Sequence, residues 1–469
     1  MAGAVARSPV AFGNILPMKT KCARLLLRFV LSSAVFIVSL VSAAAASWQE
    51  KLLLVFNGTN GGAIPTSSLI FDSAGNLYGM ASYGGDMNCL PGTGCGVVFK
   101  LTPDSAGGWK ESILYAFKGG RDGSNPGEYS GLVFDGNGNL YGTTSTGGGS
   151  AACDNGISGC GTVFKLTPTA SGPWKETILY RFAGGNGGAL PGGGPIFDRQ
   201  GNLYGTTELG GGSKHCGLAG CGVIFELSPT PTGPWTIHTL HAFNGSPSGC
   251  GNCDGGAPTG PLVFDSVGSL YGTTTNGGNN NNGTAFELMP VAGGGWKYSL
   301  IYRFFPSSTS GSFPFGGVVV DSQNNLYGTT LEGGAGTCND STGCGTVFEL
   351  TANSGVWTQT VLHSFLGGTE GQNPSFPLIL DAAGNLYGSN YGSEPVVCPP
   401  SCGTVFELSP SLSGNWTETT LFSFNNIDGT ISGALIFDPE GNLYGTAGRG
   451  GPPTACQNDT CGLVFELTP

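Results

Sequence analysis

Seven aspartates stand at the same place in a repeated string, in most copies Asp-x-x-Gly-Asn-Leu-Tyr-Gly, where a carboxylate beside a tight turn could bind calcium. They are Asp72, Asp135, Asp198, Asp265, Asp321, Asp381 and Asp438. A calcium loop takes several oxygen ligands from one short stretch, whereas each of these strings supplies one or two carboxylates and no later glutamate. We therefore predict that the aspartates cap turns, with a bound calcium ion as the alternative.

A second set of candidates occupies one position that varies from repeat to repeat, just after the Leu-Tyr-Gly string. The residues there are Tyr83, Glu208, Asn276, Glu332, Tyr391 and Arg449, with Thr146 in the remaining repeat. A ligand without sevenfold symmetry requires such variation, although neutral drift at a surface also produces it. We predict that the first six bind a ligand. The two glutamates could act as an acid/base pair if their carboxyl groups lay about 5 to 10 Å apart.

Fourteen of the 15 cysteines stand in close pairs, and we predict that each pair is a local disulfide. The pairs are Cys89/Cys95, Cys153/Cys160, Cys216/Cys221, Cys250/Cys253, Cys338/Cys344, Cys398/Cys402 and Cys456/Cys461. Zinc and redox roles are alternatives for Cys250 and Cys253, but no second dyad lies nearby and no helix start is expected there. Seven disulfides indicate an oxidising compartment.

The remaining chemistry-bearing residues do not assemble into a catalytic set. No Ser-His-Asp arrangement, metal-ligand cluster or phosphate-binding loop has the required spacing. His241 and His363 take the place that Tyr115 and Tyr180 have in other repeats, which indicates packing. The chain has 18 basic and 30 acidic residues, a net charge of −12, and this disfavours binding to nucleic acid.

The elements that position these residues are repeated seven times. The Leu-Tyr-Gly string recurs at Tyr78, Tyr141, Tyr204, Tyr271, Tyr327, Tyr387 and Tyr444, and each unit carries one tryptophan. Each unit contains four short runs rich in β-branched and aromatic residues, in the second unit 131–135, 139–144, 161–167 and 174–182. The repeat predicts an all-β, seven-bladed β-propeller of four-stranded antiparallel blades.

Two further patterns support a closed ring over a linear solenoid. Four residues before each repeated aspartate the residue is small or cyclic, as a crowded axis requires. These residues are Ser68, Gly131, Gly194, Pro261, Gly317, Pro377 and Ala434. The last unit has only three runs, and the missing fourth run is found at residues 48–56. We therefore predict that this N-terminal strand joins the last blade and closes the ring.

The first 46 residues differ in composition from the rest. They contain no acidic residue, and an apolar run from Phe29 to Val41 follows several basic residues, which is typical of a secretory signal peptide that could start at Met18. A membrane anchor is the alternative. We predict a single propeller domain over residues 47–469, secreted or periplasmic, monomeric and without a membrane span after signal cleavage.

The strings Gly138-Asn-Leu-Tyr-Gly-Thr-Thr144 and Cys160-Gly-Thr-Val-Phe-Lys-Leu-Thr-Pro168 resemble the repeats of the GloVer tandem-repeat family of exported bacterial proteins. The resemblance covers essentially the whole of the predicted mature chain. It implies an exported repeat protein with no established activity. Members are described with varied C-terminal sorting anchors, whereas this sequence ends at Pro469 without one, so the resemblance leaves surface attachment open.

Function follows from the unequal connections. The links between second and third runs, and between units, are long and Gly-rich, and in an up-and-down sheet both emerge at one end. We predict a non-catalytic binding or scaffold protein that presents this loop-rich face to a glycan, a peptide or a cell-surface protein. No cofactor is expected. The alternative is an extracellular enzyme acting on a carbohydrate or lactone, with carboxylates over the axis and calcium assistance; a purely structural envelope component is a third possibility.

Overall fold

Each repeat folds into one sheet because its four short apolar runs are rich in β-branched and aromatic residues and are separated by glycine turns. The computed structural model describes residues 48–469 except 60, 91, 128–129, 154–158, 171, 217–218, 232, 246–253, 308–309, 339–341, 393–401, 412, 426–427, 432 and 452–460. The second strand of the first sheet, β3 (Leu77–Ala81), is buried along its whole length. An outermost strand such as β10 (Lys175–Arg181) largely alternates exposed and covered residues, because one of its faces meets water.

Seven four-stranded antiparallel sheets follow one another along the chain, and we call them blades one to seven. From the innermost to the outermost strand they are β2 (Ile70–Phe71), β3, β4 (Val97–Pro103) and β5 (Trp109–Ala116); β7 (Val133–Phe134), β8 (Leu140–Thr146), β9 (Thr162–Thr167) and β10; β11 (Ala189–Phe197), β12 (Leu203–Leu209), β13 (Val223–Ser228) and β14 (Thr236–Ala242); β15 (Val263–Phe264), β16 (Leu270–Thr274), β17 (Thr284–Pro290) and β18 (Trp296–Arg303); β20 (Val318–Val320), β21 (Leu326–Thr330), β23 (Thr346–Asn353) and β24 (Val356–Ser364); β25 (Ile379–Leu380), β26 (Leu386–Tyr391), β27 (Gly403–Pro410) and β28 (Trp416–Ser423); and β30 (Ile436–Phe437), β31 (Leu443–Arg449), β32 (Leu463–Thr468) and β1 (Gln49–Val55).

Short elements complete the blades. The strands β6 (Ser124–Pro126), β19 (Gly311–Ser312) and β29 (Thr430–Ile431) precede the innermost strands, and β22 (Glu332–Gly333), which follows β21, pairs with β19. Turns of 3₁₀ type span Ala151–Cys153, Gly185–Gly187, Asn279–Asn281 and Gly368–Glu370. The part of the chain that the structure describes contains no α-helix. Accordingly, no described helix is both long and apolar enough to cross a membrane.

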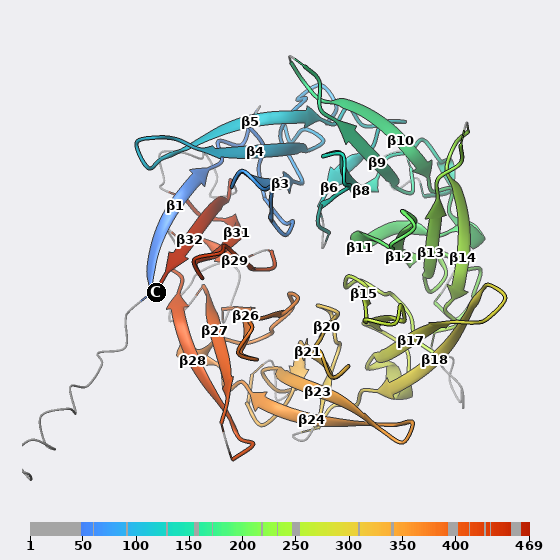
Figure 1. Cartoon of the computed structure of the whole chain (residues 1–469), viewed down its shortest axis with the longest axis vertical. Helices are drawn as coiled ribbons and strands as arrows, with labels where there is room; N and C mark the ends of the chain where they lie inside the picture. Colours follow the sequence, from blue (N-terminus) through green and yellow to red (C-terminus); the bar gives the residue numbers. More distant parts are fainter. Residues whose placement is uncertain are drawn as a thin grey trace, which may run out of the picture. The chain divides into compact units, whose positions relative to one another are not determined.

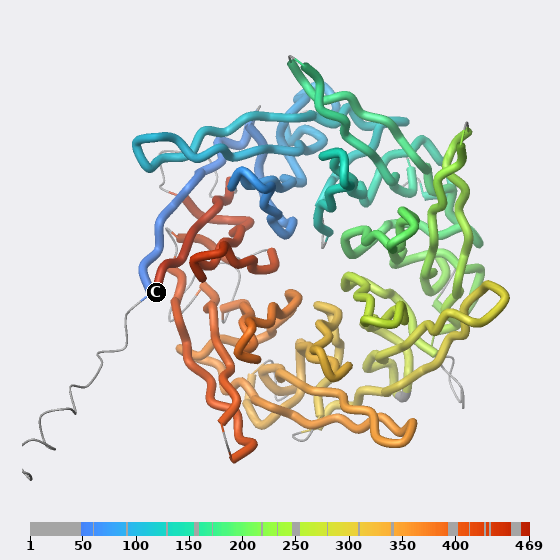
Figure 2. Tube along the Cα trace, viewed as in Figure 1, coloured from blue at the N-terminus to red at the C-terminus, as the bar shows by residue number. Residues whose placement is uncertain are grey.

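The blades stand around a common axis, with the inner strands at the centre and strands such as β5, β10 and β28 at the rim (Figure 1). The trace passes once around the axis in chain order, from the blue first blade to the red last blade (Figure 2). The predicted seven-bladed propeller is thus confirmed, and the linear solenoid is excluded.

The ring is closed by the N-terminal strand, as the sequence predicts. Strand β1 pairs with β32 in antiparallel register from Gln49 opposite Thr468 to Val55 opposite Leu463, so that it forms the outer strand of blade seven. Figure 1 shows blue β1 beside red β32. Beyond β1, the backbone N–H of Phe56 donates to the carbonyl of Gly462 at 3.0 Å. The two ends of the ring are therefore joined by one sheet.

The small residues before the innermost strands allow adjacent blades to meet near the axis. Ser68 of blade one forms an isolated parallel bridge with Gly131 of blade two. A Cβ atom on Gly194 of blade three would come within 2.8 Å of the Gly131 backbone nitrogen. A larger side chain at Gly194 would force the innermost strands apart. This confirms the predicted reason for a small residue at Gly194, whereas Gly131 is less crowded, since an added Cβ there would lie 3.6 Å from its nearest neighbour.

The repeated tyrosine joins neighbouring blades. The Tyr78 ring of blade one packs edge-to-face on Phe134 of blade two, with ring centroids 5.1 Å apart, and also contacts Trp174. Its hydroxyl donates to Asp72 Oδ2 at 2.9 Å, while Asp72 Oδ1 accepts the backbone N–H groups of Ala74 and Asn76. Burial would raise the pKa of Asp72, but these hydrogen bonds outweigh it and lower the pKa. The predicted role in turn capping is confirmed.

Candidate ligand-binding site

The two faces of the propeller differ in their connections. On one face the innermost and second strands are joined by tight turns, as between Phe71 and Leu77. On the other face, second and third strands are joined by longer segments, as between Ala81 and Val97, and the links between blades emerge there too. We call this second side the loop face. Sites tend to collect on loops that a rigid scaffold holds.

Disulfides hold the loops between the second and third strands. Cys89–Cys95, Cys153–Cys160, Cys216–Cys221 and Cys338–Cys344 are bonded as predicted. Cys402 and Cys461 are also disulfide-bonded. Their predicted partners, and the predicted pair Cys250/Cys253, lie outside the described residues. Each closed loop of about six residues is worth roughly 2 kcal/mol by chain entropy.

A repeated backbone contact ties the loop face of each blade to the next. In six blades the residue before a proline has positive φ: Ile64 (54°), Asn125 (55°), Leu190 (55°), Ala257 (51°), Phe313 (60°) and Asn373 (56°). Their backbone N–H groups donate, at 2.8 to 3.1 Å, to the carbonyls of Cys461, Cys95, Cys160, Cys221, Asn282 and Cys344 of the preceding blade. We call this contact the inter-blade lock. Such left-handed backbone costs on the order of 1–3 kcal/mol at a non-glycine residue, so the surrounding contacts must offset it.

The proline of each lock packs on the glycine that follows the hydrogen-bonded residue. A Cβ on Gly161 would lie 2.5 Å from Cδ of Pro191, and one on Gly222 would lie 2.7 Å from Cδ of Pro258. The interface between blades six and seven differs, because blade seven has no proline from Thr430 to Asp438. Sequence reasoning missed the lock, although the Cys-Gly string and the proline both recur in the sequence.

We expect Gly161→Ala to destabilise the fold by about 2–4 kcal/mol, because the new methyl group meets Cδ of Pro191 and the carbonyl oxygen of Thr144, each at 2.5 Å, and φ is 98°. Gly172→Ala is the matched control: its φ is 100° and nothing lies within 4 Å of the added Cβ. The control measures backbone strain alone, about 1 kcal/mol. Urea unfolding of both variants gives the difference, and equal losses would show that close packing around Gly161, by Pro191 and the Thr144 carbonyl, carries no energy.

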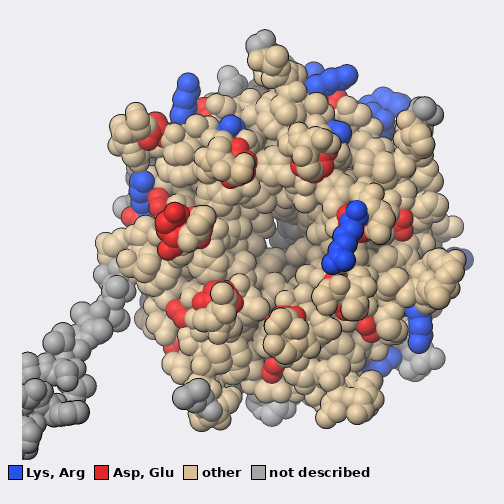
Figure 3. All heavy atoms as spheres, in the orientation of Figure 1, with Lys and Arg blue, Asp and Glu red and all other residues tan. Residues whose placement is uncertain are grey.

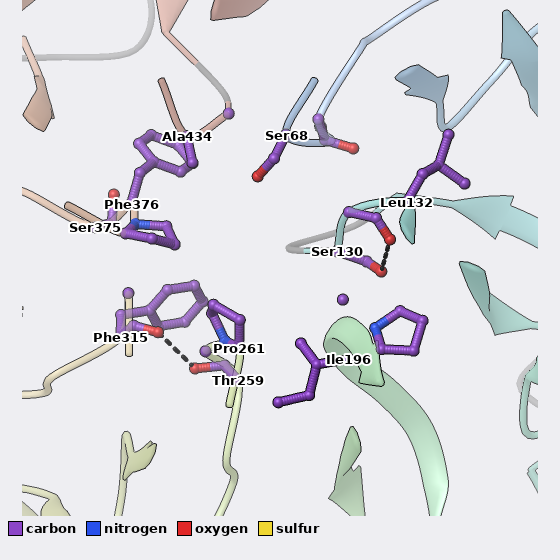
Figure 4. Close-up of a pocket in the computed structure, with 18 of the residues that line it drawn as sticks. Ser68, Ser130, Leu132, Ile196, Thr259, Pro261, Phe315, Ser375, Phe376 and Ala434 are labelled. Carbon is purple, nitrogen blue, oxygen red and sulfur yellow. Dashed lines mark hydrogen bonds between the residues drawn. The ribbon is translucent and has the colours of Figure 1, made fainter. Parts of the chain in front are cut away.

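A cavity with a volume of about 190 Å³ lies on the axis of the ring, where the segments that follow the locks reach the centre. Figure 3 shows the molecule hollowed at its centre, and Figure 4 shows side chains from several blades around the opening. Apolar groups supply most of the wall, among them Leu132, Ile196, Pro261, Phe315, Phe376 and Ala434. None of the described residues that line the cavity has a titratable side chain.

Three of the five hydroxyl side chains of the wall are engaged within the protein. Thr259 donates to the carbonyl of Phe315 at 3.2 Å, and Thr66 donates to the carbonyl of Gly127 at 3.0 Å. The Ser130 hydroxyl lies 3.0 Å from that of Thr143. These bonds connect neighbouring segments of the wall, so the surface left for a ligand is mainly apolar.

The six predicted ligand-binding residues lie at the loop face, but in paired backbone instead of free loops. Tyr83, Asn276 and Tyr391 bridge Ala63, Gly256 and Gln372, and Glu332 and Arg449 pair with Ser312 and Thr430. Glu208 lies between the paired residues Thr207 and Leu209 of β12. None of the six lines the axial cavity. Tyr391 supports its wall from behind, since its ring lies 5.5 Å from Phe376.

The two predicted carboxylate partners belong to different blades. Glu208 lies in β12 of blade three and Glu332 in β22 of blade five. Both are half-buried. Burial raises the pKa of Glu332, and a hydrogen bond with Thr342 partly offsets this. Whether the six residues bind a ligand stays a prediction.

Acidic residues of the links between blades bond to aromatic residues of the outermost strands. Nε2 of His241 lies 2.9 Å from Asp254, and the His241 ring stacks on Tyr298 at 3.7 Å. His363 lies 2.9 Å from Glu370 in the same way. Both histidines thus pack within the layer, as their sequence position indicates. Among the described residues, no three His, Cys, Asp or Glu side chains are placed to hold a metal ion.

Comparison with known proteins connects the chain to one repeat family. The model of the Gloeobacter/Verrucomicrobia repeat matches residues 150–365 and 297–469, which confirms the resemblance expected from the repeated strings. No curated protein matches the chain.

Solved structures add a likeness in fold. A fungal alcohol oxidase of the AA5 family, in complex with copper, aligns with a TM-score of 0.51 and 13% identity, over 90% of this chain and 75% of that one. A protein from Lactobacillus plantarum aligns with a TM-score of 0.48 and 13% identity, over 79% of this chain and 95% of that one. Likeness at such low identity concerns the fold alone.

Proposed function

The chain belongs to the Gloeobacter/Verrucomicrobia repeat family, and from that premise we propose that it is an exported, non-catalytic binding or scaffold protein. Its loop face engages a glycan, a peptide or a protein of the cell surface. The observation that carries the proposal is the axial cavity, whose described lining offers apolar surface and no titratable group. A cavity of this kind can hold a ligand but lacks the means to transfer a proton.

Export is supported by the cysteines. Bonded pairs such as Cys153–Cys160 and Cys338–Cys344 form and persist in oxidising compartments outside the cytoplasm. Disulfides and inter-blade locks also fix the loop segments before any ligand arrives. A prearranged surface loses less conformational freedom on binding, which favours recognition.

The enzymatic alternative depends on Glu208 and Glu332 acting on the same substrate. They lie in blades three and five and neither lines the cavity. A calcium ion remains part of that alternative, so calcium is included in the test below.

A thermal-shift panel tests the proposal with the purified protein against neutral polysaccharides, a peptide library and calcium chloride. We expect a glycan or a peptide to stabilise the fold, by about 2.7 kcal/mol at a hundredfold excess over its Kd, without release of any product. Tyr83→Ala on the loop face should weaken this binding. Glu440→Ala, an exposed residue of a turn on the opposite face, is the control. Turnover of a carbohydrate or lactone that Glu208→Gln abolishes would overturn the proposal.

A further inference from the structure

The axial cavity has the size and surface of a pocket for one apolar group. Its volume is about 190 Å³, and an apolar cavity of about 150 Å³ in another protein binds benzene. Figure 4 shows Phe315 and Phe376 on one side of the opening and Leu132 and Ile196 on the other. A phenyl ring or a branched aliphatic side chain would therefore be surrounded by apolar groups on several sides.

The wall offers little to a strongly polar group. Of its five hydroxyl side chains, those of Thr66, Ser130 and Thr259 already bond within the protein, which leaves only Ser68 and Ser375 for the several hydroxyls of a sugar unit. Burying sugar hydroxyls without partners costs free energy, whereas burying an apolar ring is favourable in proportion to the area removed from water. The surface chemistry thus favours an apolar side chain over a sugar.

We propose that the axial cavity is an anchor pocket for one aromatic or branched aliphatic side chain of a peptide segment, flanked in that segment by lysine or arginine, which docks on the loop face. This inference rests on the proposed binding function and names its partner class. A single buried apolar anchor surrounded by weaker polar contacts is the usual arrangement of an energetically important centre in a protein interface.

The basic flanks follow from charge. Five of the 18 Lys and Arg residues precede residue 48, which leaves 13 basic against 30 acidic side chains in the rest of the chain. Opposite charge on the partner increases the rate of encounter and selects among partners.

Two acidic residues lie in the segments that lead into the cavity wall. Glu332 pairs with Ser312, and the chain reaches the wall at Phe315. Glu208 lies between residues paired with β11, whose chain reaches the wall at Gly194. Both glutamates therefore belong to strands that pair with the segments entering the cavity wall. In the proposal, their carboxylates attract the basic groups beside the inserted side chain and take no part in catalysis.

The test uses the full propeller and three peptides: acetyl-Lys-Lys-Phe-Lys-Lys-amide, the same peptide with alanine in place of phenylalanine, and the phenylalanine peptide with four glutamates in place of the lysines. Saturation-transfer NMR identifies the bound group, and titration gives the affinity. We expect the phenylalanine–lysine peptide to bind at least tenfold more tightly than the other two, with magnetisation transfer strongest at the phenyl ring.

Gly131→Leu fills the cavity and is expected to reduce binding of the phenylalanine peptide at least tenfold. Position 131 accepts a side chain, because its nearest neighbour, Cβ of Ser68, lies 3.6 Å from an added Cβ and its φ is not positive. Gly136→Leu, in an exposed turn of the same blade with nothing within 4 Å, is the matched control and should bind as the parent does. Glu332→Gln should weaken binding severalfold at low salt and less at high salt.

The outcomes separate the two proposals. A peptide or glycan that binds equally to the parent and to Gly131→Leu, and is lost in Tyr83→Ala, would overturn the anchor pocket and leave the binding function standing. A neutral oligosaccharide that binds the parent but not Gly131→Leu would show that the cavity takes a sugar, and would overturn the proposal of a peptide side chain. Equal affinity of the phenylalanine and alanine peptides would also overturn the pocket, and failure of every peptide and glycan to bind would overturn both proposals.

Discussion

A chain that lacks residues 48–56 is expected to lose the cooperative fold of the ring. The deletion removes strand β1 and so leaves the edge of β32 without its partner from Leu463 to Thr468. It also removes Leu53 and Phe56, which are 8% and 1% exposed. Since a domain of ordinary stability has about 5–15 kcal/mol in total, the combined loss of one strand and its buried side chains is close to the whole.

A single substitution measures the same closure without deleting backbone. Phe56→Ala should cost about 3–5 kcal/mol, because the ring is buried against Phe99, 5.2 Å away between centroids, at the junction of blades seven and one. Phe305→Ala is the control: Phe305 is 45% exposed, so its loss should cost less than about 0.5 kcal/mol. Urea unfolding followed by tryptophan fluorescence and circular dichroism measures both.

A synthetic peptide of residues 48–56 should restore the deleted strand. Strand β1 is joined to blade seven only by pairing and packing, so the peptide can occupy the same edge in trans. We expect its addition to raise the unfolding midpoint of the truncated chain in a concentration-dependent manner. If the truncated chain unfolds at the same urea concentration as the parent, the ring does not depend on this closure.

The architecture could be predicted from the sequence because its determinants are repeated in residue type. Strand and turn positions are marked seven times, by the Leu-Tyr-Gly string, by the capping aspartates such as Asp72 and by the single tryptophans. A wrong strand or turn assignment in one unit is therefore corrected by comparison with the other six. The closing strand was predictable for the same reason, since one outer strand was missing at the end and present at the start.

The inter-blade lock and the cavity wall could not be predicted in this way. The lock residues Ile64, Leu190 and Phe313 share a positive φ and a hydrogen bond across blades, but no side-chain type. Backbone conformation of this kind is set by the neighbouring blade and leaves no signal at the position itself. Phe315 and Phe376 were missed as wall residues because serine, threonine or glycine stands near the corresponding places in other blades.

Glu176→Gln is expected to stabilise the protein above neutral pH. Glu176 of β10 lies between blades one and two, where its carboxylate and that of Asp122 accept the single hydroxyl hydrogen of Tyr115 at 3.1 and 2.8 Å. Burial and, after it, the nearby Asp122 together raise the pKa of Glu176 to about 9, against smaller opposing effects of Tyr115 and Arg181. The Tyr115 hydroxyl supplies only one hydrogen to these two carboxylates. A second proton, held by Glu176, removes the repulsion between the two negative charges.

The sign of the pH dependence follows from that raised pKa. The folded protein binds the proton more tightly than the unfolded chain, whose glutamate has a pKa of 4.5. The contribution of Glu176 to the stability of the parent is therefore fully present at low pH and is lost as the pH rises from about 4.5 towards 9. Glutamine keeps the shape without the charge, so we expect the variant to be more stable by about 2 kcal/mol at pH 9, with allowance for the part of the side chain that water reaches.

Urea unfolding of the parent and of Glu176→Gln at pH 5, 7 and 9 measures the effect, with Glu440→Gln in an exposed turn as the control. The two curves should converge at pH 5, where the parent carboxyl is protonated in the fold, and separate as the pH rises. Glu50 reports on a second interface in the same way, because burial and the neighbouring Asp428 raise its pKa to about 8. A difference between parent and glutamine variant that does not grow from pH 5 to pH 9, or a variant that is less stable at pH 9, would mean that the Glu176 carboxylate is ionised in the fold. In that case the contact between blades one and two would hold two negative charges around Tyr115. The packing between these blades would then have to offset the free-energy cost of burying the Glu176 charge.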